Sequence, residues 1–157
     1  MIHKLQVTIM ILLIPALGLY WYAERNDIPL SDFLIVSTPV VRIDDIPIQV
    51  EVADTPEKRE IGLSGRDRVG LQGLLFIFDE SDYHKIWMKG MKFPIDVIWI
   101  SEDLEVVGVT ENMLPNSYPK TVFEPPKPIK YLIETEANFA DTFDIAAGDE
   151  VELPKGY

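Results

Sequence analysis

The residues best suited to chemistry lie in one apolar stretch, residues 73–100, where Trp87, Lys89 and Asp96 stand among strand-forming side chains. Trp87 and Lys89 are two positions apart, so a strand would place both on one face. An aromatic ring beside an ammonium group on a sheet face suits a sugar or another flat polar ligand. The alternative is that Trp87 belongs to the core and that the stem of Lys89 passes over it to reach solvent.

Asp96 is unusual because alternation along its expected strand places it on the same side as the apolar Ile98. A carboxylate there needs a partner or a raised pKa. The expected strands at residues 85–89 and 95–100 are joined by a short turn, which predicts an antiparallel hairpin with Lys89 opposite Asp96. A structural ion pair is therefore the first expectation for Asp96, ahead of a catalytic role.

Glu111 and Glu134 are the other two carboxylates of interest, and Glu134 shares a strand face with Leu132. Two carboxyl groups whose pKa values differ in one pocket act as general acid and base, so Asp96, Glu111 and Glu134 are the candidate catalytic residues. A solvated outer face explains Glu134 equally well.

Glu111 leads into the longest irregular segment, residues 113–129, which is rich in proline and contains Tyr118. Such a loop in a compact domain is usually functional or mobile, although a cover for a sheet edge is an equal alternative. We therefore predict a ligand-binding cleft beneath this loop. Its expected lining is Trp87, Lys89, Glu111 and Tyr118, with Asp96 and Glu134 at the floor.

Other catalytic signatures are absent from the sequence. The chain has no cysteine, and its two histidines are His3 and His84, so neither a thiolate nucleophile nor a serine triad is expected. The acidic loop at residues 79–84 lacks the spacing and the glycine of an EF-hand. No metal and no cofactor are predicted.

Residues 5–23 form an uncharged apolar run that is followed by a short charged segment. As a helix this run is long enough to span a bilayer, with aromatic residues 20–22 at one interface. It predicts a transmembrane anchor at residues 1–27 with the following domain on the extracytoplasmic side. The alternative is a cleaved signal peptide with an acceptable site at residues 16–18, which would release a secreted domain.

The formal charge of -12 falls on the chain beyond residue 27, because residues 1–27 contain two positive and two negative side chains. Nucleic acid is therefore not an expected partner. Membrane contact is expected through the N-terminal helix alone.

Residues 28–45 are expected to be a linker with a candidate strand at 33–36, and residues 46–157 a single domain. Alternation predicts a strand at 46–52, followed by a helix that begins at Asp54 with Glu57 completing a capping box and ends at Gly62 or Gly65. Further strands are expected at 74–78, 85–89, 95–100, 105–110, 130–135 and 150–153, and a short helix at 138–143. This pattern predicts a mainly β fold, an antiparallel sandwich or barrel with one or two short helices.

Several motifs together resemble the domain-of-unknown-function family DUF192: Gly62-Leu63, Arg66-Asp67, Gly73-Leu74-Leu75-Phe76, Trp87-Met88-Lys89, Pro94-Ile95-Asp96, Glu111, Pro115 and Tyr131-Leu132-Ile133-Glu134. The resemblance covers about residues 46–153 and implies a jelly-roll-like sandwich. Leu74 replaces the methionine that is usual in the family, and Gly90-Met91 replaces an Asn-Thr pair. The second departure leaves open whether this chain shares any ligand contact made by that pair.

The first functional hypothesis is a membrane-tethered extracytoplasmic binding or accessory module for a cell-envelope ligand or partner protein. The alternative is a small hydrolase or lyase that uses two of the three carboxylates on a substrate stacked on Trp87 and charge-matched by Lys89. A non-enzymatic role is the preferred expectation.

Overall fold

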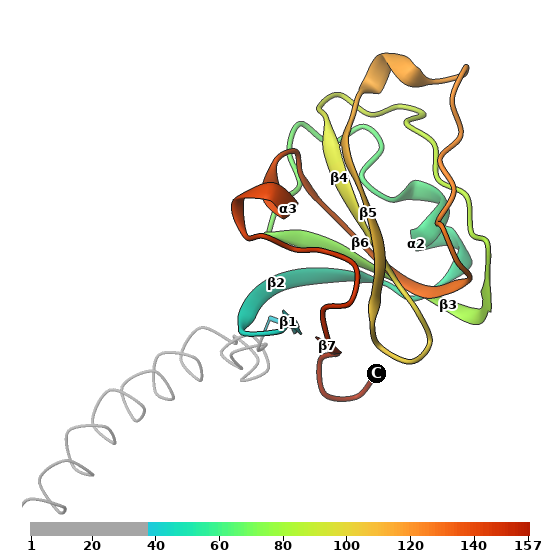
Figure 1. Cartoon of the computed structure of the whole chain (residues 1–157). Helices are drawn as coiled ribbons and strands as arrows, with labels where there is room; N and C mark the ends of the chain where they lie inside the picture. The colour runs from blue at the N-terminus through green and yellow to red at the C-terminus, as the bar shows by residue number, and fades with distance from the viewer. Residues whose placement is uncertain (1–37) are drawn as a thin grey trace, which may run out of the picture. The chain divides into compact units, whose positions relative to one another are not determined.

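The computed structural model describes residues 38–157, which are drawn in colour in Figure 1. The elements are β1 (Val40–Ile43), β2 (Ile46–Ala53), α2 (Pro56–Ile61), β3 (Gly73–Asp82), β4 (Ile95–Ile100), β5 (Val106–Met113), the 3-10 helix η2 (Pro115–Ser117), β6 (Ile129–Glu136), α3 (Phe139–Thr142) and β7 (Val151–Glu152). The anchor or signal predicted at residues 1–27 and the candidate strand at 33–36 lie outside the described residues. None of the helices within residues 38–157 has the length and apolar character needed to cross a membrane.

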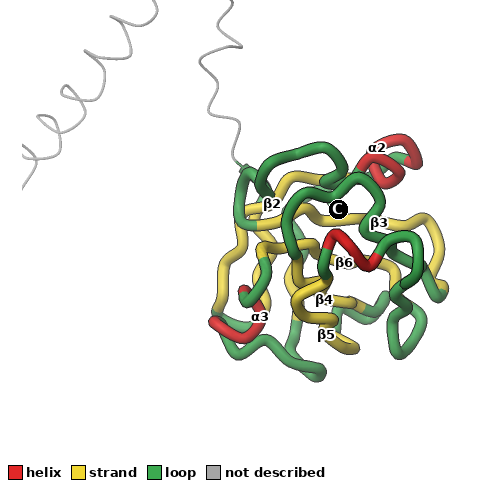
Figure 2. The backbone as a smooth tube through the Cα atoms, turned by 90° about the horizontal axis from the view of Figure 1, so that it is seen from above, coloured by secondary structure: helices red, strands yellow, loops and turns green. Residues whose placement is uncertain are grey.

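The seven strands form one sheet in the order β5-β4-β6-β3-β2-β1-β7. Strand β2 turns a corner, because residues 46–49 pair with β1 and residues 50–53 pair with β3. The two outer strands also meet: the Val106 amide donates to the Asp149 carbonyl at 3.0 Å, and the Val151 amide donates to the Leu104 carbonyl at 2.9 Å. The sheet is therefore curled upon itself, as the view from above in Figure 2 shows.

The prediction of a mainly β fold with short helices is confirmed, but the strands form one curled sheet instead of two separate sheets. Strands β2 and β3 are parallel, contrary to a purely antiparallel arrangement, because α2 and the loop after it carry the chain back across the sheet. Helix α2 begins one residue later than predicted. Thr55 is its N-cap and accepts from the Lys58 amide, while the Asp54 carboxylate instead pairs with the Lys58 ammonium at 2.7 Å.

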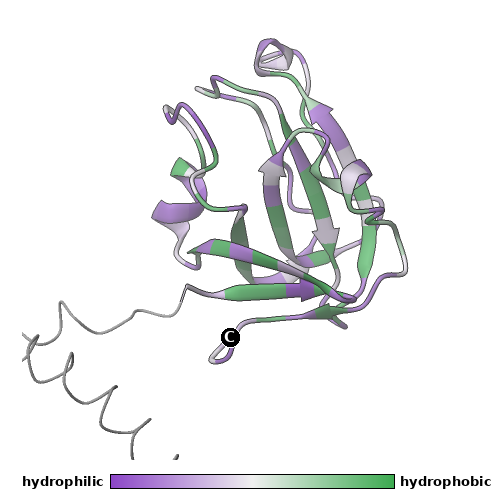
Figure 3. Cartoon of the chain, turned by 90° about the vertical axis from the view of Figure 1, so that its left-hand side faces the viewer, coloured by the Kyte–Doolittle hydropathy of each residue, from purple (hydrophilic) through white to green (hydrophobic). Residues whose placement is uncertain are grey.

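Two hydrophobic clusters lie on the two faces of this sheet. The first takes side chains from all seven strands and from α3, so it fills the interior of the curl. The second lies on the outer face of β3, β4 and β6, where Leu63, Val69 and Met88 from the covering loops pack against it. Figure 3 shows that the strands carry much of the hydrophobic sequence. Strand β4 is buried along its whole length, because both of its faces meet a cluster.

The hairpin predicted between residues 85–89 and 95–100 is wrong. Strand β4 instead pairs with β5 on one side and β6 on the other. Residues 85–89 cover the outer cluster as an irregular segment, in which Ile86 forms an isolated bridge with Phe123. Met88 is the buried residue of this segment, so its apolar character reflects packing against the sheet and not membership of it.

Candidate functional site

Glu134 carries a buried carboxyl group and is the centre of the candidate site. It lies on β6 between Leu74 of β3 and Val97 of β4, both of which are buried. The side chain is 5% exposed, and its Oε2 atom makes no hydrogen bond within the described residues. Burial raises the pKa of Glu134 from 4.5 to about 8, against a smaller opposing effect of the Arg66 guanidinium. The group is therefore mainly protonated and neutral at pH 7.

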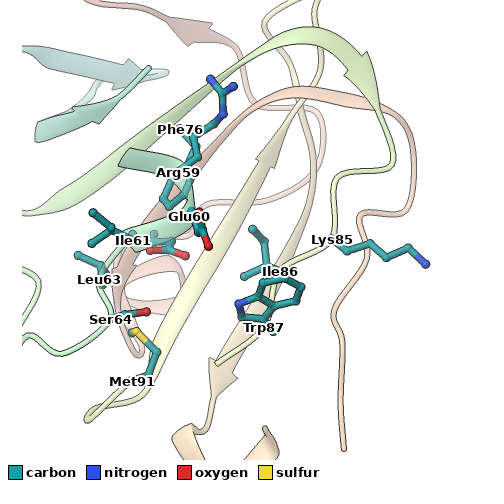
Figure 4. Close-up of a pocket in the computed structure, with 12 residues that line it drawn as sticks. Arg59, Glu60, Ile61, Leu63, Ser64, Phe76, Lys85, Ile86, Trp87 and Met91 are labelled. Carbon is teal, nitrogen blue, oxygen red and sulfur yellow. The ribbon is translucent and has the colours of Figure 1, made fainter. Parts of the chain in front are cut away.

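A pocket of about 90 Å³ adjoins Glu134. Its lining comes from α2 and the turn after it, from the segment at residues 85–91, and from β3 and β6: Arg59, Glu60, Ile61, Gly62, Leu63, Ser64, Phe76, Lys85, Ile86, Trp87, Met91 and Glu134. Figure 4 shows most of these side chains gathered around the cavity. The volume is enough for several water molecules or for a group of a few non-hydrogen atoms.

Trp87 marks the solvent side of the pocket. Its side chain is 51% exposed, whereas the neighbouring Met88 is buried. The alternative that placed Trp87 in the core is therefore wrong, and its indole surface is available to a ligand. An exposed tryptophan beside an internal polar group is a common arrangement for holding small ligands, since the ring contributes contact area with little loss of conformational entropy.

The two walls of the pocket are fixed by contacts outside it. On the α2 side, the Arg59 guanidinium donates to the Ile77 carbonyl at 2.6 Å and pairs with Asp79 at 3.2 Å. On the other side, Ile86 and Phe123 exchange two backbone hydrogen bonds of 2.9 Å, and Lys85 pairs with Glu124. In Figure 4 the ends of the Arg59 and Lys85 side chains point away from the other lining residues.

Gly62 lies against both the carboxyl group and an aromatic ring. Its φ is 50°, and a Cβ atom at this position would lie 3.2 Å from Cζ of Phe76 and 3.8 Å from Oε2 of Glu134. A glycine thus permits the turn after α2 and leaves open the space in front of the carboxyl group.

We predict that Gly62→Ala destabilises the protein by about 2 kcal/mol, because the backbone conformation is strained for alanine and the methyl group crowds Phe76. Gly65→Ala is the matched control, since Gly65 also has a positive φ of 78° but would meet nothing within 4 Å. Denaturant unfolding of both variants measures the difference. Equal losses for the two variants would contradict a close approach at Gly62.

Asp96 lies on the inner face of the sheet and does not meet Glu134. It is fully buried, and its two oxygens accept backbone hydrogen bonds from Asn112 at 2.8 Å and Ala140 at 3.1 Å. The irregular register between β4 and β5 at this point places the Asn112 amide in reach. The predicted ion pair with Lys89 is therefore wrong. The Asp96 carboxylate accepts hydrogen bonds from backbone amides at the start of α3 and at a bulge of β5, which is a structural role.

The remaining sequence candidates lie away from the pocket. Lys89 and Glu111 are exposed, and Tyr118 is 41% exposed; none of the three lines the cavity around Glu134. No residue of the 113–129 loop lines that cavity either, so the predicted cleft beneath the loop is not the pocket. The loop contacts the pocket only indirectly, because Phe123 and Glu124 bind the segment that carries Trp87.

The sequence interpretation missed the contribution of α2 and its C-terminal turn. Arg59, Glu60 and Ser64 line the pocket, yet none was a candidate. Their only signal was their position around Gly62-Leu63, one of the motifs of the family resemblance. Within residues 38–157, no cluster of three or more histidine, cysteine or acidic side chains is arranged to hold a metal ion.

The DUF192 family model, described as Uncharacterized ACR, matches residues 39–153. A crystal structure of a protein from Sinorhizobium meliloti 1021, whose provisional description is transcription regulator, is similar with a TM-score of 0.68 and 28% identity over 73% of this chain and 92% of that one. A protein of unknown function from Novosphingobium aromaticivorans DSM 12444 has a TM-score of 0.66 and 25% identity over 72% of this chain and 83% of that one. The comparison with curated proteins found no match. The match of the family model over most of the sequence shows that this chain belongs to the DUF192 family.

Proposed function

We propose that this domain is a binding module that holds a small organic ligand between Glu134 and Trp87. The observation that carries this proposal is Glu134, which lines the pocket and whose buried Oε2 atom makes no hydrogen bond within the described residues. Leaving a buried polar atom unpaired costs about 1–3 kcal/mol, and a ligand that bonds to it would recover that energy. The exposed indole of Trp87 supplies an apolar contact for the same ligand.

The alternative of a hydrolase or lyase needed two of the three predicted carboxylates in one pocket, and the structure does not bring two of them together. Asp96 is on the inner face with both oxygens occupied, and Glu111 is exposed outside the pocket, so of the three predicted carboxylates only Glu134 borders the cavity. A general acid and base must both reach the same bound substrate. The arrangement therefore favours binding over catalysis by these three carboxylates.

The proposed module would be held at the membrane, as the apolar run at residues 5–23 indicates. The formal charge of -12 also disfavours binding to DNA, so a role in transcription is not proposed.

We predict that the full-length protein fractionates with membranes and that a variant lacking residues 1–27 does not. Membrane fractionation followed by determination of the mature N-terminus is the measurement. A mature soluble protein that begins near residue 19 would instead support the cleaved signal peptide.

The binding proposal is tested by screening small organic fragments against the full-length protein while the indole N–H signal of Trp87 is followed by NMR. For each fragment that shifts this signal, the affinities of the native and variant proteins are then compared by titration calorimetry. Trp87→Ala, which lacks the signal itself, should weaken binding at least about tenfold, the equivalent of about 1.4 kcal/mol. It should change the free energy of unfolding by less than about 1 kcal/mol, because the side chain is half exposed.

Tyr118→Ala is the matched control, since Tyr118 is also an exposed aromatic residue but does not line the pocket. This variant should bind the same fragments as tightly as the native protein. Equal losses of binding in the two variants, or fragments that all bind elsewhere, would contradict the proposed site.

A further inference from the structure

We propose that the ligand of this pocket is a small primary ammonium compound, with the cationic nitrogen at Glu134 and the attached carbon chain against Trp87. This inference rests on the proposed binding function and adds the chemical class of the ligand. It follows from the charges around the cavity, from the hydrogen bonds that Glu134 lacks, and from the position of the indole.

The basic side chains of the pocket lining already have acidic partners. Arg59 pairs with Asp79, and Lys85 pairs with Glu124. Just outside the lining, Arg66 makes a two-bond contact with Glu51, at 2.7 and 3.0 Å. Little positive charge is thus left free to receive an anionic ligand.

The acidic side chains of the lining show the opposite situation. Glu60 and Glu134 have no ion-pair partner within residues 38–157, although both border the cavity. Once Glu134 is ionised, the pocket carries two uncompensated negative charges, and the formal charge of -12 adds a field that attracts cations. Electrostatic complementarity therefore favours a positively charged ligand.

A primary ammonium group fits the unsatisfied carboxyl group better than a quaternary one. It has three N–H donors, which can pair with the Glu134 carboxylate and with Oγ of Ser64 on the same lining. The exposed indole at the pocket mouth packs against the carbon chain. The volume of about 90 Å³ limits the enclosed part to a short chain.

Binding of this cation couples to the loss of a proton. The free pocket holds Glu134 mainly in the protonated form at pH 7, because its pKa is about 8. An ammonium ion favours the ionised carboxylate, so binding should release one proton from Glu134 to solvent. The other charged groups that face it, Glu60, Arg59, Lys85 and the Arg66–Glu51 pair, are exposed or already paired.

The test uses n-propylammonium chloride as the probe and 1-propanol as its neutral counterpart, with the full-length protein and the Trp87 indole signal as the readout. The affinity for propylammonium should rise about fiftyfold between about pH 6 and about pH 8, since the ligand stays protonated while Glu134 ionises. Glu134→Gln should weaken this binding at least about tenfold and abolish the pH dependence. Glu60→Gln should weaken it less and leave the pH dependence in place.

The neutral probe separates failure of this inference from failure of the binding function. If 1-propanol binds at the Trp87 signal as tightly as propylammonium, or if affinity falls as the pH rises, the ligand is a neutral hydrogen-bond acceptor and the cation inference is overturned while the pocket stands. If neither probe nor any fragment of the screen binds there, both proposals fail. A further arm uses Nα-acetyl-lysine N-methylamide. If this compound binds more tightly than propylammonium, the ammonium group of the ligand belongs to a lysine side chain. If it binds more weakly, the ligand is a free amine.

Discussion

The free energy of unfolding of the native protein should fall as the pH rises, and Glu134→Gln should abolish this fall. The folded carboxyl group has a pKa of about 8, whereas the unfolded group has the ordinary value of 4.5. Between these values the folded state keeps a proton that the unfolded state has released, so the free energy of unfolding falls with increasing pH. The full difference across this window is roughly 5 kcal/mol.

Denaturant unfolding at a series of pH values between about 4 and about 9 measures this effect, as the difference between the native protein and Glu134→Gln. The difference cancels the titration of all other groups. Glu60→Gln is the control, because Glu60 lines the same pocket but is exposed. Its pH profile should parallel that of the native protein. A Glu134→Gln profile that also runs parallel would show that Glu134 ionises normally in the folded state.

Asp96→Ala should destabilise the protein by about 3 kcal/mol. The substitution removes the acceptors of the buried Ala140 amide and of the partly buried Asn112 amide, and a buried amide left unpaired costs about 1–3 kcal/mol. Asp96→Asn keeps one acceptor oxygen and should lose about half as much. The denaturant midpoint, with the slope of the transition unchanged, gives these values.

Lys89→Ala distinguishes this explanation from the ion pair that the sequence predicted. Lys89 is exposed and has no ion-pair partner within the described part of the chain, so its removal should change the free energy of unfolding by less than about 0.5 kcal/mol. A loss for Lys89→Ala similar to that for Asp96→Ala would restore the ion pair and contradict the capping role.

The strands could be predicted closely where the pattern was local. The expected strand at residues 95–100 coincides with β4, and the expected strand at 46–52 differs from β2 by one residue, because continuous apolar runs and strict alternation depend on neighbouring residues alone. The strand predicted at residues 85–89 was wrong because it too was inferred from the local pattern alone. Their apolar residues pack onto the outer face of the sheet, and a run of this length does not distinguish a strand from a covering segment.

The site was harder to predict because it depends on which side chains are covered. Alternation placed Asp96 with Ile98, and Glu134 with Leu132, on the faces that they occupy. It gave no indication that Glu134 would lie between Leu74 and Val97, or that the turn after α2 would close over it. Burial of Glu134 arises from contacts between distant parts of the sequence, and the sheet order that creates them is not a local property.

The ionisation of the Glu134 carboxyl group is the most direct test of this account. Carbon-13 NMR of full-length protein labelled at glutamate Cδ, with the signal assigned by its absence in Glu134→Gln, follows that single group through a pH titration. We expect a midpoint of about 8 in the free protein and a midpoint lower by at least about one pH unit when n-propylammonium is saturating. A midpoint near 4.5 that does not respond to any pocket ligand would contradict it.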